Sequence, residues 1–125
     1  MAKIERTFAV VGSNCFTGSH FVDAILENPS NRVVGISRSP EKKPAFLPYA
    51  RHGDGRFEFH RLNTVREMDK VIELLDARKP FCVINVAGLS EVNLSNFRPL
   101  DYFHTNTVAV ADLASRLRER KWLER

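Results

Sequence analysis

The stretch FAVVGSNCFTGSHFVDAIL, residues 8–26, decides how the rest of this chain is interpreted. A short apolar run ends at Gly12, and Gly18 follows six positions later. Apolar residues then recur at helical spacing, at Phe21, Ala24 and Ile25. This pattern predicts a strand, a tight turn and a helix. Gly12 permits the sharp turn because it has no Cβ, and Gly18 lets the helix start close to the strand.

The predicted turn also has a chemical consequence. The free N–H groups in the first turn of the helix would face outward at the positive end of the helix dipole, which suits a diphosphate. Two glycines between a strand and a helix also occur in ordinary turns that bind nothing. The stretch alone therefore leaves a binding turn and a purely structural turn as alternatives.

The amino-acid sequence of the turn favours a binding turn over a purely structural one. Residues 12–20, GSNCFTGSH, resemble the Gly-x-x-Gly-Phe-x-Gly-Ser-His opening of the extended short-chain dehydrogenase/reductases, the NAD(P)-dependent sugar-nucleotide epimerases and dehydratases. Cys15 departs from this pattern because it stands where the family has its middle glycine, and its side chain would narrow the space for a pyrophosphate. A second segment matches the family's Val-x-x-Ser, Pro, Tyr and Asn positions, at Val92, Ser95, Pro99, Tyr102 and Asn106.

The order of elements predicts an α/β fold. Strands are expected at residues 8–11, 32–37, 57–62 and 81–87, and helices after the glycine turn, over 68–79 and from Pro99. Right-handed crossovers then give a Rossmann-type parallel sheet of strand order 3-2-1-4 with helices on both faces, incomplete relative to the family. Residues 1–125 form one domain in this interpretation. Residues 39–56 are expected to be a loop whose apolar residues fold back over the core.

The end of the second strand suggests which cofactor the family resemblance implies. An acidic residue about 20 positions past the glycine turn would bind the ribose of NAD. Arg38 stands there, between Ser37 and Ser39. A guanidinium with two hydroxyls fits a 2′-phosphate, so NADP is favoured and NAD is the alternative. Arg38 as an ordinary solvent-facing residue at a strand end also remains open.

Further site residues follow from the other strand ends. Asn63 takes the place of a family aspartate that accepts from the adenine amino group, and small residues end the fourth strand where the nicotinamide ribose packs. In the family, the asparagine at the position of Asn106 braces the active site. The predicted cofactor-binding residues are Gly12, Asn14, Cys15, Phe16, Gly18, Ser37, Arg38, Ser39, Asn63, Ala87, Gly88 and Asn106. No catalytic residue and no metal ligand is predicted.

The family's catalytic Tyr-x-x-x-Lys pair is missing. Four positions after Tyr49 comes Gly53, and four positions after Tyr102 comes Asn106. The chain therefore resembles the N-terminal part of a longer enzyme, inactive alone, that meets its nucleotide sugar only together with the absent C-terminal half. A non-catalytic NADP-binding sensor or regulatory module is the alternative. A thiol switch at Cys15, near a helix N-terminus, is a third and weaker hypothesis.

Composition excludes several other classes of protein. The chain is 43% hydrophobic and 27% charged, as in ordinary globular proteins. Residues 116–125 hold five basic and two acidic side chains, which supply +3 of the net charge of +4. This end is expected to be the solvated end of a helix rather than a nucleic-acid patch. With two cysteines, no apolar signal core and no membrane-length run, a cytoplasmic protein without membrane contact is expected.

Two further expectations concern packing. The uninterrupted apolar run 81–87 predicts a strand buried on both faces, yet without a fifth strand Phe81 to Val86 would be an exposed edge that invites self-association or a second chain. The helix from Pro99 is expected to turn one apolar side toward the sheet. That side comprises Leu100, Phe103, Val110, Leu113, Ala114 and Leu117.

Overall fold

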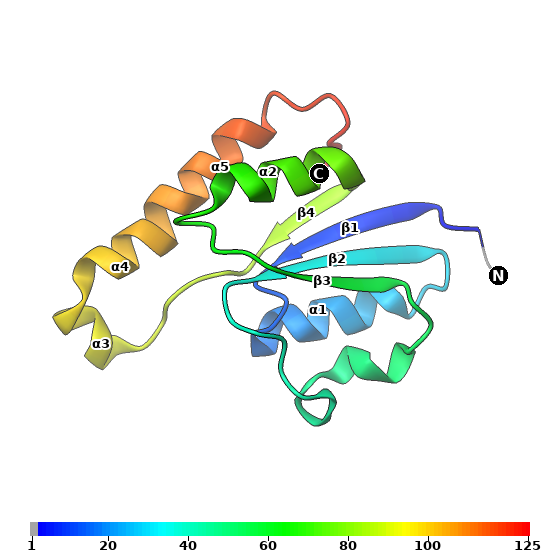
Figure 1. Ribbon diagram of the computed structural model, residues 1–125, viewed down its shortest axis with the longest axis horizontal. Coiled ribbons are helices and arrows are strands. Elements are labelled where there is room, and N and C mark those ends of the chain that lie inside the picture. Colours follow the sequence, from blue (N-terminus) through cyan, green and yellow to red (C-terminus); the bar gives the residue numbers. More distant parts are fainter. Residues whose placement is uncertain (1–2) are drawn as a thin grey trace.

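The computed structural model describes residues 3–125, and its centre is a parallel sheet (Figure 1). The four strands lie in the order β3-β2-β1-β4, and each neighbouring pair is parallel. The strands are β1 (Arg6–Val11), β2 (Asn31–Ser37), β3 (Phe57–Arg61) and β4 (Cys82–Asn85). The predicted Rossmann-type fold with strand order 3-2-1-4 is confirmed.

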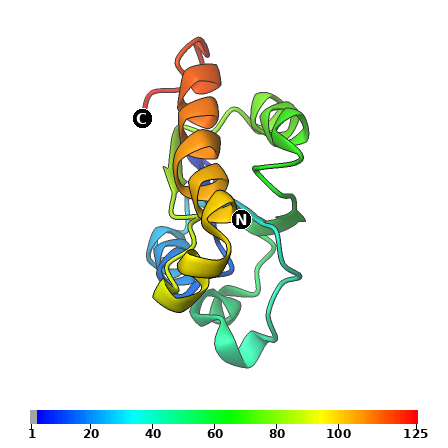
Figure 2. The same ribbon diagram turned by 90° about the vertical axis from the view of Figure 1, so that its left-hand side faces the viewer.

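Helices cover both faces of the sheet (Figures 1 and 2). One face carries α1 (Phe16–Leu26) with the short 3-10 segments η1 (Pro44–Phe46) and η2 (Pro48–His52). The other face carries α2 (Met68–Arg78) and α5 (Ala109–Leu117). Between β4 and α5 lie α3 (Val92–Phe97), α4 (Pro99–Phe103) and the π-helical turn η3 (His104–Val108).

The central strand β1 divides the core into two layers. Side chains of a strand alternate between the faces of its sheet. Ala9 and Val11 therefore pack with the apolar side chains of α2 and α5, whereas Val10 packs with those of α1 and η2. All three β1 side chains are at most 1% exposed. This burial fixes the position of Gly12, which follows the strand directly.

The loop between β2 and β3 covers the core as predicted. Leu47 and Tyr49 are buried in the cluster that contains Val22 and Leu26 of α1, although Phe46 is 71% exposed. Burial, more than the nearby Glu41 carboxylate, raises the pKa of the Tyr49 phenol.

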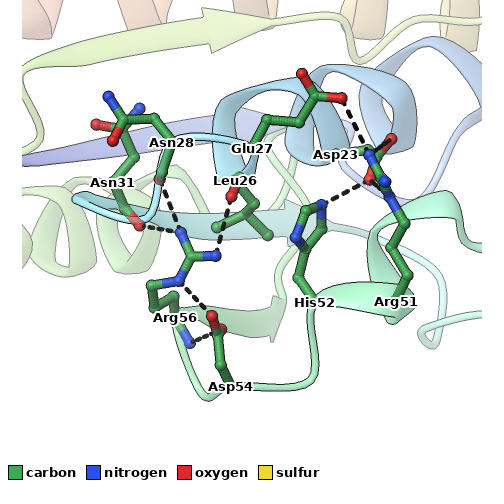
Figure 3. Close-up of polar contacts among 9 residues, drawn as sticks. All are labelled: Asp23, Leu26, Glu27, Asn28, Asn31, Arg51, His52, Asp54 and Arg56. Carbon is green, nitrogen blue, oxygen red and sulfur yellow. Dashed lines mark hydrogen bonds and ion pairs between the residues drawn. The ribbon is translucent and has the colours of Figure 1, made fainter. Parts of the chain in front are cut away.

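Polar contacts attach this loop to α1 (Figure 3). Arg51 donates to both carboxylate oxygens of Asp23 at 2.8 and 3.1 Å, and it also reaches Glu27 at 3.1 Å. His52 Nε2 lies 2.8 Å from the same Asp23 carboxylate. The hydrogen bond from Arg51 and the one from His52 hold the pKa of Asp23 below its usual range, against the opposing effect of burial.

Arg56 closes the C-terminal end of α1 (Figure 3). Its guanidinium donates to the backbone carbonyl oxygens of Leu26, Asn28 and Asn31 at 2.9, 2.9 and 3.0 Å. Helix ends leave such carbonyls without intrahelical partners. Arg56 thus joins the end of α1, the start of β2 and the segment before β3 through one side chain that is only 12% exposed.

The helix after Pro99 differs from the expectation in its first half. Ala109, Leu113 and Leu117 are buried against the sheet, but Leu100 and Phe103 are 69% and 64% exposed. Val110 is 39% exposed as well. Ala114 is exposed too, so the prediction that Leu100, Phe103, Val110 and Ala114 face the sheet is wrong. Leu100 and Phe103 are exposed because α4 extends past the ends of the strands, where no sheet lies beneath it (Figure 1). Val110 and Ala114 directly follow the buried Ala109 and Leu113, so they lie about 100° further round α5.

The fourth strand also differs from the expectation. Cys82, Val83 and Ile84 are only half-buried, so burial on both faces is wrong for this chain. Its outer edge is partly occupied by the end of the chain itself. Val83 N–H donates to the Arg125 carbonyl oxygen at 2.9 Å, and Arg125 N–H donates to the Phe81 carbonyl oxygen at 3.1 Å. This is the bonding pattern of a parallel strand pair.

The basic end is ion-paired instead of simply solvated. Arg116 Nη1 contacts Asp69 at 2.6 Å, and Arg120 contacts the Asp76 carboxylate at 3.0 and 3.1 Å. Trp122 Nε1 donates to the same carboxylate at 3.0 Å. These pairs join the end of the chain to α2. No helix within residues 3–125 is both long enough and apolar enough to cross a bilayer.

Candidate binding cleft

A cleft of about 260 Å³ lies where all four strands end at their carboxyl termini. In open parallel sheets, ligands bind at this edge, where the strand order reverses. The change of direction here falls between β1 and β4. Nine of the predicted site residues line the cleft: Gly12, Asn14, Cys15, Ser37, Arg38, Ser39, Asn63, Ala87 and Gly88. Phe16, Gly18 and Asn106 do not line it.

The two glycines of the turn are required by close contacts. Gly12 has a φ of +93°, and a Cβ there would lie 2.7 Å from the backbone nitrogen of Ala87. A Cβ at Gly18 would lie 2.0 Å from the carbonyl oxygen of Gly12. Any side chain at either position would collide with backbone. The turn therefore lies tightly between the end of β4 and the first turn of α1, as the glycine spacing indicates.

Most backbone N–H groups of the turn are already bonded. The N–H groups of Gly12 and Ser13 donate to the Ile36 carbonyl oxygen at 2.7 and 3.3 Å. The Asn14 N–H donates to Ser37 Oγ at 3.0 Å. These bonds attach the glycine turn to the end of β2. Ser37 is only 8% exposed, and its hydroxyl mainly holds the glycine turn in place.

Cys15 forms the N-cap of α1. Its Sγ accepts a hydrogen bond from the Gly18 N–H at 3.2 Å, so the thiol takes one of the donors at the helix start. Among residues 3–125, the N–H groups of Phe16 and Thr17 have no acceptor. The Phe16 N–H lies next to the lining residue Cys15 without lining the cleft itself, and the Phe16 ring is 78% exposed and lies against His20 with 4.6 Å between ring centroids.

Two positively charged side chains line the cleft beside the glycine turn. Arg38 lines it and is exposed, and its guanidinium forms no hydrogen bond or ion pair within the described chain. Lys42 also lines the cleft, and its ammonium is equally without a carboxylate partner there. The sequence pattern missed Lys42, because it lies four positions beyond Arg38 in a loop with no regular periodicity. Ser39 lines the cleft beside them.

Asn63 lies in the cleft wall but is largely used by its own turn. Its Oδ1 accepts from the N–H groups of Val65 and Arg66 at 2.8 and 3.3 Å. Its backbone N–H donates to Glu67 at 2.9 Å, and this bond is the main reason that the pKa of the Glu67 carboxyl is lowered. Of the polar atoms in the Asn63 side chain, Nδ2 is left as a hydrogen-bond donor for the cleft. An apolar wall that the sequence did not indicate lies beside it, made by Ile36, Leu62 and Val65.

Asn106 acts at the rim of the cleft. Its Oδ1 accepts from the Leu89 N–H and its Nδ2 donates to the Leu89 carbonyl oxygen, both at 2.8 Å. The amide thereby holds the segment after Gly88, while the neighbouring Thr105 lines the cleft. Tyr102 is also engaged, because its hydroxyl donates to the Glu91 carbonyl oxygen at 2.5 Å.

Comparison with protein families gives a match over nearly the whole chain. Residues 8–123 match the NAD dependent epimerase/dehydratase family. The chain belongs to this family. The match includes the glycine turn, all four ends of the strands and the helix after Pro99, so the resemblance stated from residues 12–20 and 92–106 is confirmed.

Individual relatives of this family are similar at modest identity. The UDP-glucose 4-epimerase of Dictyostelium discoideum is 28% identical over 126 residues, covering 97% of this chain and 36% of the relative. The UDP-D-apiose/UDP-D-xylose synthase 1 of Arabidopsis thaliana is 26% identical over 105 residues, covering 82% and 26%. The chain thus spans about a quarter to a third of the length of these relatives.

Solved epimerase structures share the fold. The UDP-glucuronic acid 4-epimerase of Bacillus cereus, solved with UDP-glucuronic acid and NAD, aligns with a TM-score of 0.71 and 26% identity. The alignment covers 94% of this chain and 38% of that structure.

Proposed function

We propose that this chain binds a nicotinamide dinucleotide as the cofactor-binding part of a longer nucleotide-sugar epimerase or dehydratase. The observation that carries the proposal is the cleft at the strand ends, which is lined by Arg38 and Lys42 without carboxylate partners among residues 3–125 and which lies beside the free amide donors at the start of α1. The Phe16 and Thr17 N–H groups, at the positive end of α1, suit the diphosphate. The apolar wall of Ile36, Leu62 and Val65 suits the adenine.

We propose that the bound dinucleotide is NADP, which carries a 2′-phosphate, rather than NAD, which lacks it. Arg38 and Lys42 lie free at the cleft, and no carboxylate among residues 3–125 lines it. Two cations and the Ser39 hydroxyl suit a 2′-phosphate, whereas a free ribose 2′-hydroxyl would call for an acidic acceptor. The B. cereus relative was solved with NAD, so NAD remains the competing cofactor.

Calorimetric titration with NADP⁺ and NAD⁺ tests both parts. We expect tighter binding of NADP⁺, and we expect Arg38→Ala to lower NADP⁺ affinity by roughly tenfold or more while changing NAD⁺ affinity little. Asn31→Ala, at the opposite end of β2, is the matched control. Tighter binding of NAD⁺ would refute the cofactor choice, and binding of neither dinucleotide would refute the proposed function.

We also propose that the chain does not catalyse sugar chemistry by itself. A tyrosine acts as a base in this family's pattern through a lysine four positions later, and neither tyrosine has one. Burial raises the pKa of Tyr49 further, which opposes a role as a base, and the Tyr102 hydroxyl is already bonded to Glu91. Turnover of a UDP-sugar by the purified chain would contradict this.

A last proposal concerns partners. The outer edge of β4 is bonded to Arg125 only beside Phe81 and Val83, and the strand is half-buried. An incompletely paired edge favours addition of another strand, from a second copy or from a second polypeptide. Sedimentation velocity over a wide concentration range tests for self-association. A monomer at all concentrations would contradict pairing between copies.

A further inference from the structure

The side chain of Asn14 connects two segments that line the cleft, the glycine turn and the loop after β2. Asn14 belongs to the glycine turn beside α1, yet its amide reaches the loop that follows β2. Nδ2 donates to Ser39 Oγ at 2.8 Å and to the Pro40 carbonyl oxygen at 2.7 Å. Oδ1 accepts from the Lys42 N–H at 2.9 Å. Both amide protons and the carbonyl oxygen are therefore used, and the residue is only 4% exposed.

These bonds fix the segment that carries the free cations. Arg38 comes directly before Ser39, and Lys42 is held through its own backbone N–H. The only other contact to this backbone from a distant side chain is Arg61 Nε to the Arg38 carbonyl oxygen at 3.1 Å, within residues 3–125. Asn14 is therefore the main side-chain attachment of residues 38–42, whereas Leu47, Tyr49, Arg51 and His52 attach the later part of the loop to α1.

We propose that Asn14 is a positioning residue that sets the selectivity of the cleft for NADP over NAD. This inference rests on the proposed function, since it concerns the same cleft. Arg38 and Lys42 have long, exposed side chains, which lose conformational freedom when they close on a phosphate. Fixing the backbone on both sides of them before binding lowers that cost. The benefit applies to the 2′-phosphate, which NAD lacks.

The chemistry of the asparagine side chain is specific to this role. An amide is both donor and acceptor, so it can bond two acceptors in the loop and one backbone N–H at once. Asp in its place would still accept from Lys42 N–H but would donate to neither Ser39 nor Pro40. Its negative charge would also oppose binding of a phosphate at the adjoining cations.

The test compares wild type with Asn14→Ala, Asn14→Asp and Arg38→Ala. Asn31→Ala is the control, because the Asn31 side chain also bonds a backbone carbonyl, that of Ile25 at 3.1 Å, far from the cleft. Titration with NADP⁺ and NAD⁺ gives the affinity ratio of each protein. We expect both Asn14 variants to lower NADP⁺ affinity by roughly tenfold and NAD⁺ affinity by less than about threefold, and Asn31→Ala to leave the ratio unchanged.

A measurement without cofactor accompanies the titration. Amide hydrogen exchange of Lys42 should become faster in both the Ala and the Asp variant if Asn14 holds the loop, with less change in Asp, which keeps the acceptor. Combining Asn14→Ala with Arg38→Ala should lower selectivity little beyond Arg38→Ala alone, because the two residues act on one interaction.

The outcomes separate this inference from the proposed function. A wild-type preference for NADP⁺ that Arg38→Ala removes and Asn14→Ala leaves intact would overturn the inference and keep the function. Equal losses for both dinucleotides in the Asn14 variants would reduce Asn14 to a general structural role and also overturn it. A wild type that binds neither dinucleotide, or prefers NAD⁺, would overturn the cofactor assignment and the selectivity role with it.

Discussion

Replacing Arg56 by alanine removes the side chain that closes the end of α1. Three backbone carbonyl oxygens, those of Leu26, Asn28 and Asn31, lose their guanidinium donors. With a net value of about 1 kcal/mol for each such bond, the expected loss is about 3 kcal/mol of unfolding free energy. The Asp54 contact adds little, because that carboxylate is 51% exposed. A loss of this size is a large fraction of the roughly 5–15 kcal/mol typical of a domain.

Urea unfolding, followed by far-UV circular dichroism and by Trp122 fluorescence, measures this change. The midpoint should fall by about 1–3 M, since slopes for small domains are about 1–3 kcal/mol per M. Trp122 packs in the core layer of α2 and α5, whereas Arg56 closes α1 on the other face of the sheet, so agreement of the two signals tests whether both layers unfold as one unit. Arg56→Lys should recover part of the loss, because a lysine keeps the charge but lacks the branched donors.

Arg51→Ala is the control for this experiment. Arg51 is also drawn in Figure 3 and also makes three bonds, but its side chain is 57% exposed and its acceptors are carboxylates. Water can replace those bonds, so a much smaller change is expected. Equal losses for Arg51→Ala and Arg56→Ala would refute the reasoning that burial of the arginine side chain decides the cost.

Two further predictions concern titratable groups. The hydrogen bond from Arg78 lowers the pKa of Glu58 from its ordinary value of 4.5, so the stabilisation from this pair is present above that pH and is lost as the pH falls through the lower folded value. The difference in unfolding free energy between wild type and Glu58→Gln should therefore shrink below pH 4.5, and a difference that persists at pH 2 would contradict this. Iodoacetamide at neutral pH should modify the exposed Cys15 before Cys82, whose pKa is raised by burial, as peptide mass spectrometry would show; faster reaction at Cys82 would count against it.

Local patterns were sufficient to predict the sheet. Gly12 and Gly18, between an apolar run and a helical stripe, indicate a tight turn, and apolar runs followed by polar residues mark the strand ends. Parallel strands of known connectivity then bring those ends to one edge, which is why nine of the twelve predicted site residues line one cleft.

Tertiary contacts account for most of what the sequence did not reveal. The exposure of Leu100 and Phe103 depends on where the sheet ends, and no periodicity within the helix contains that information. The pairing of Arg120 with Asp76 joins segments 44 positions apart. Asn14 was predicted as a cofactor contact because of its place in the turn. Its bonds to the loop after β2 depend on a side-chain direction that the sequence does not give.

The π-helical turn η3, between α4 and α5, determines the direction in which the side chains of α4 point. A π turn contains one residue more than an α turn at the same height, so it rotates the preceding helix by about 100° relative to an unbroken α-helix. Leu113 and Leu117 fix the phase of α5 against the sheet, and the rotation therefore falls on α4. Loss of a single residue from His104–Val108 would restore one continuous α-helical phase. The apolar side chains of α4 would then point in a new direction. Asn106 would no longer be placed to accept the hydrogen bond from the Leu89 N–H.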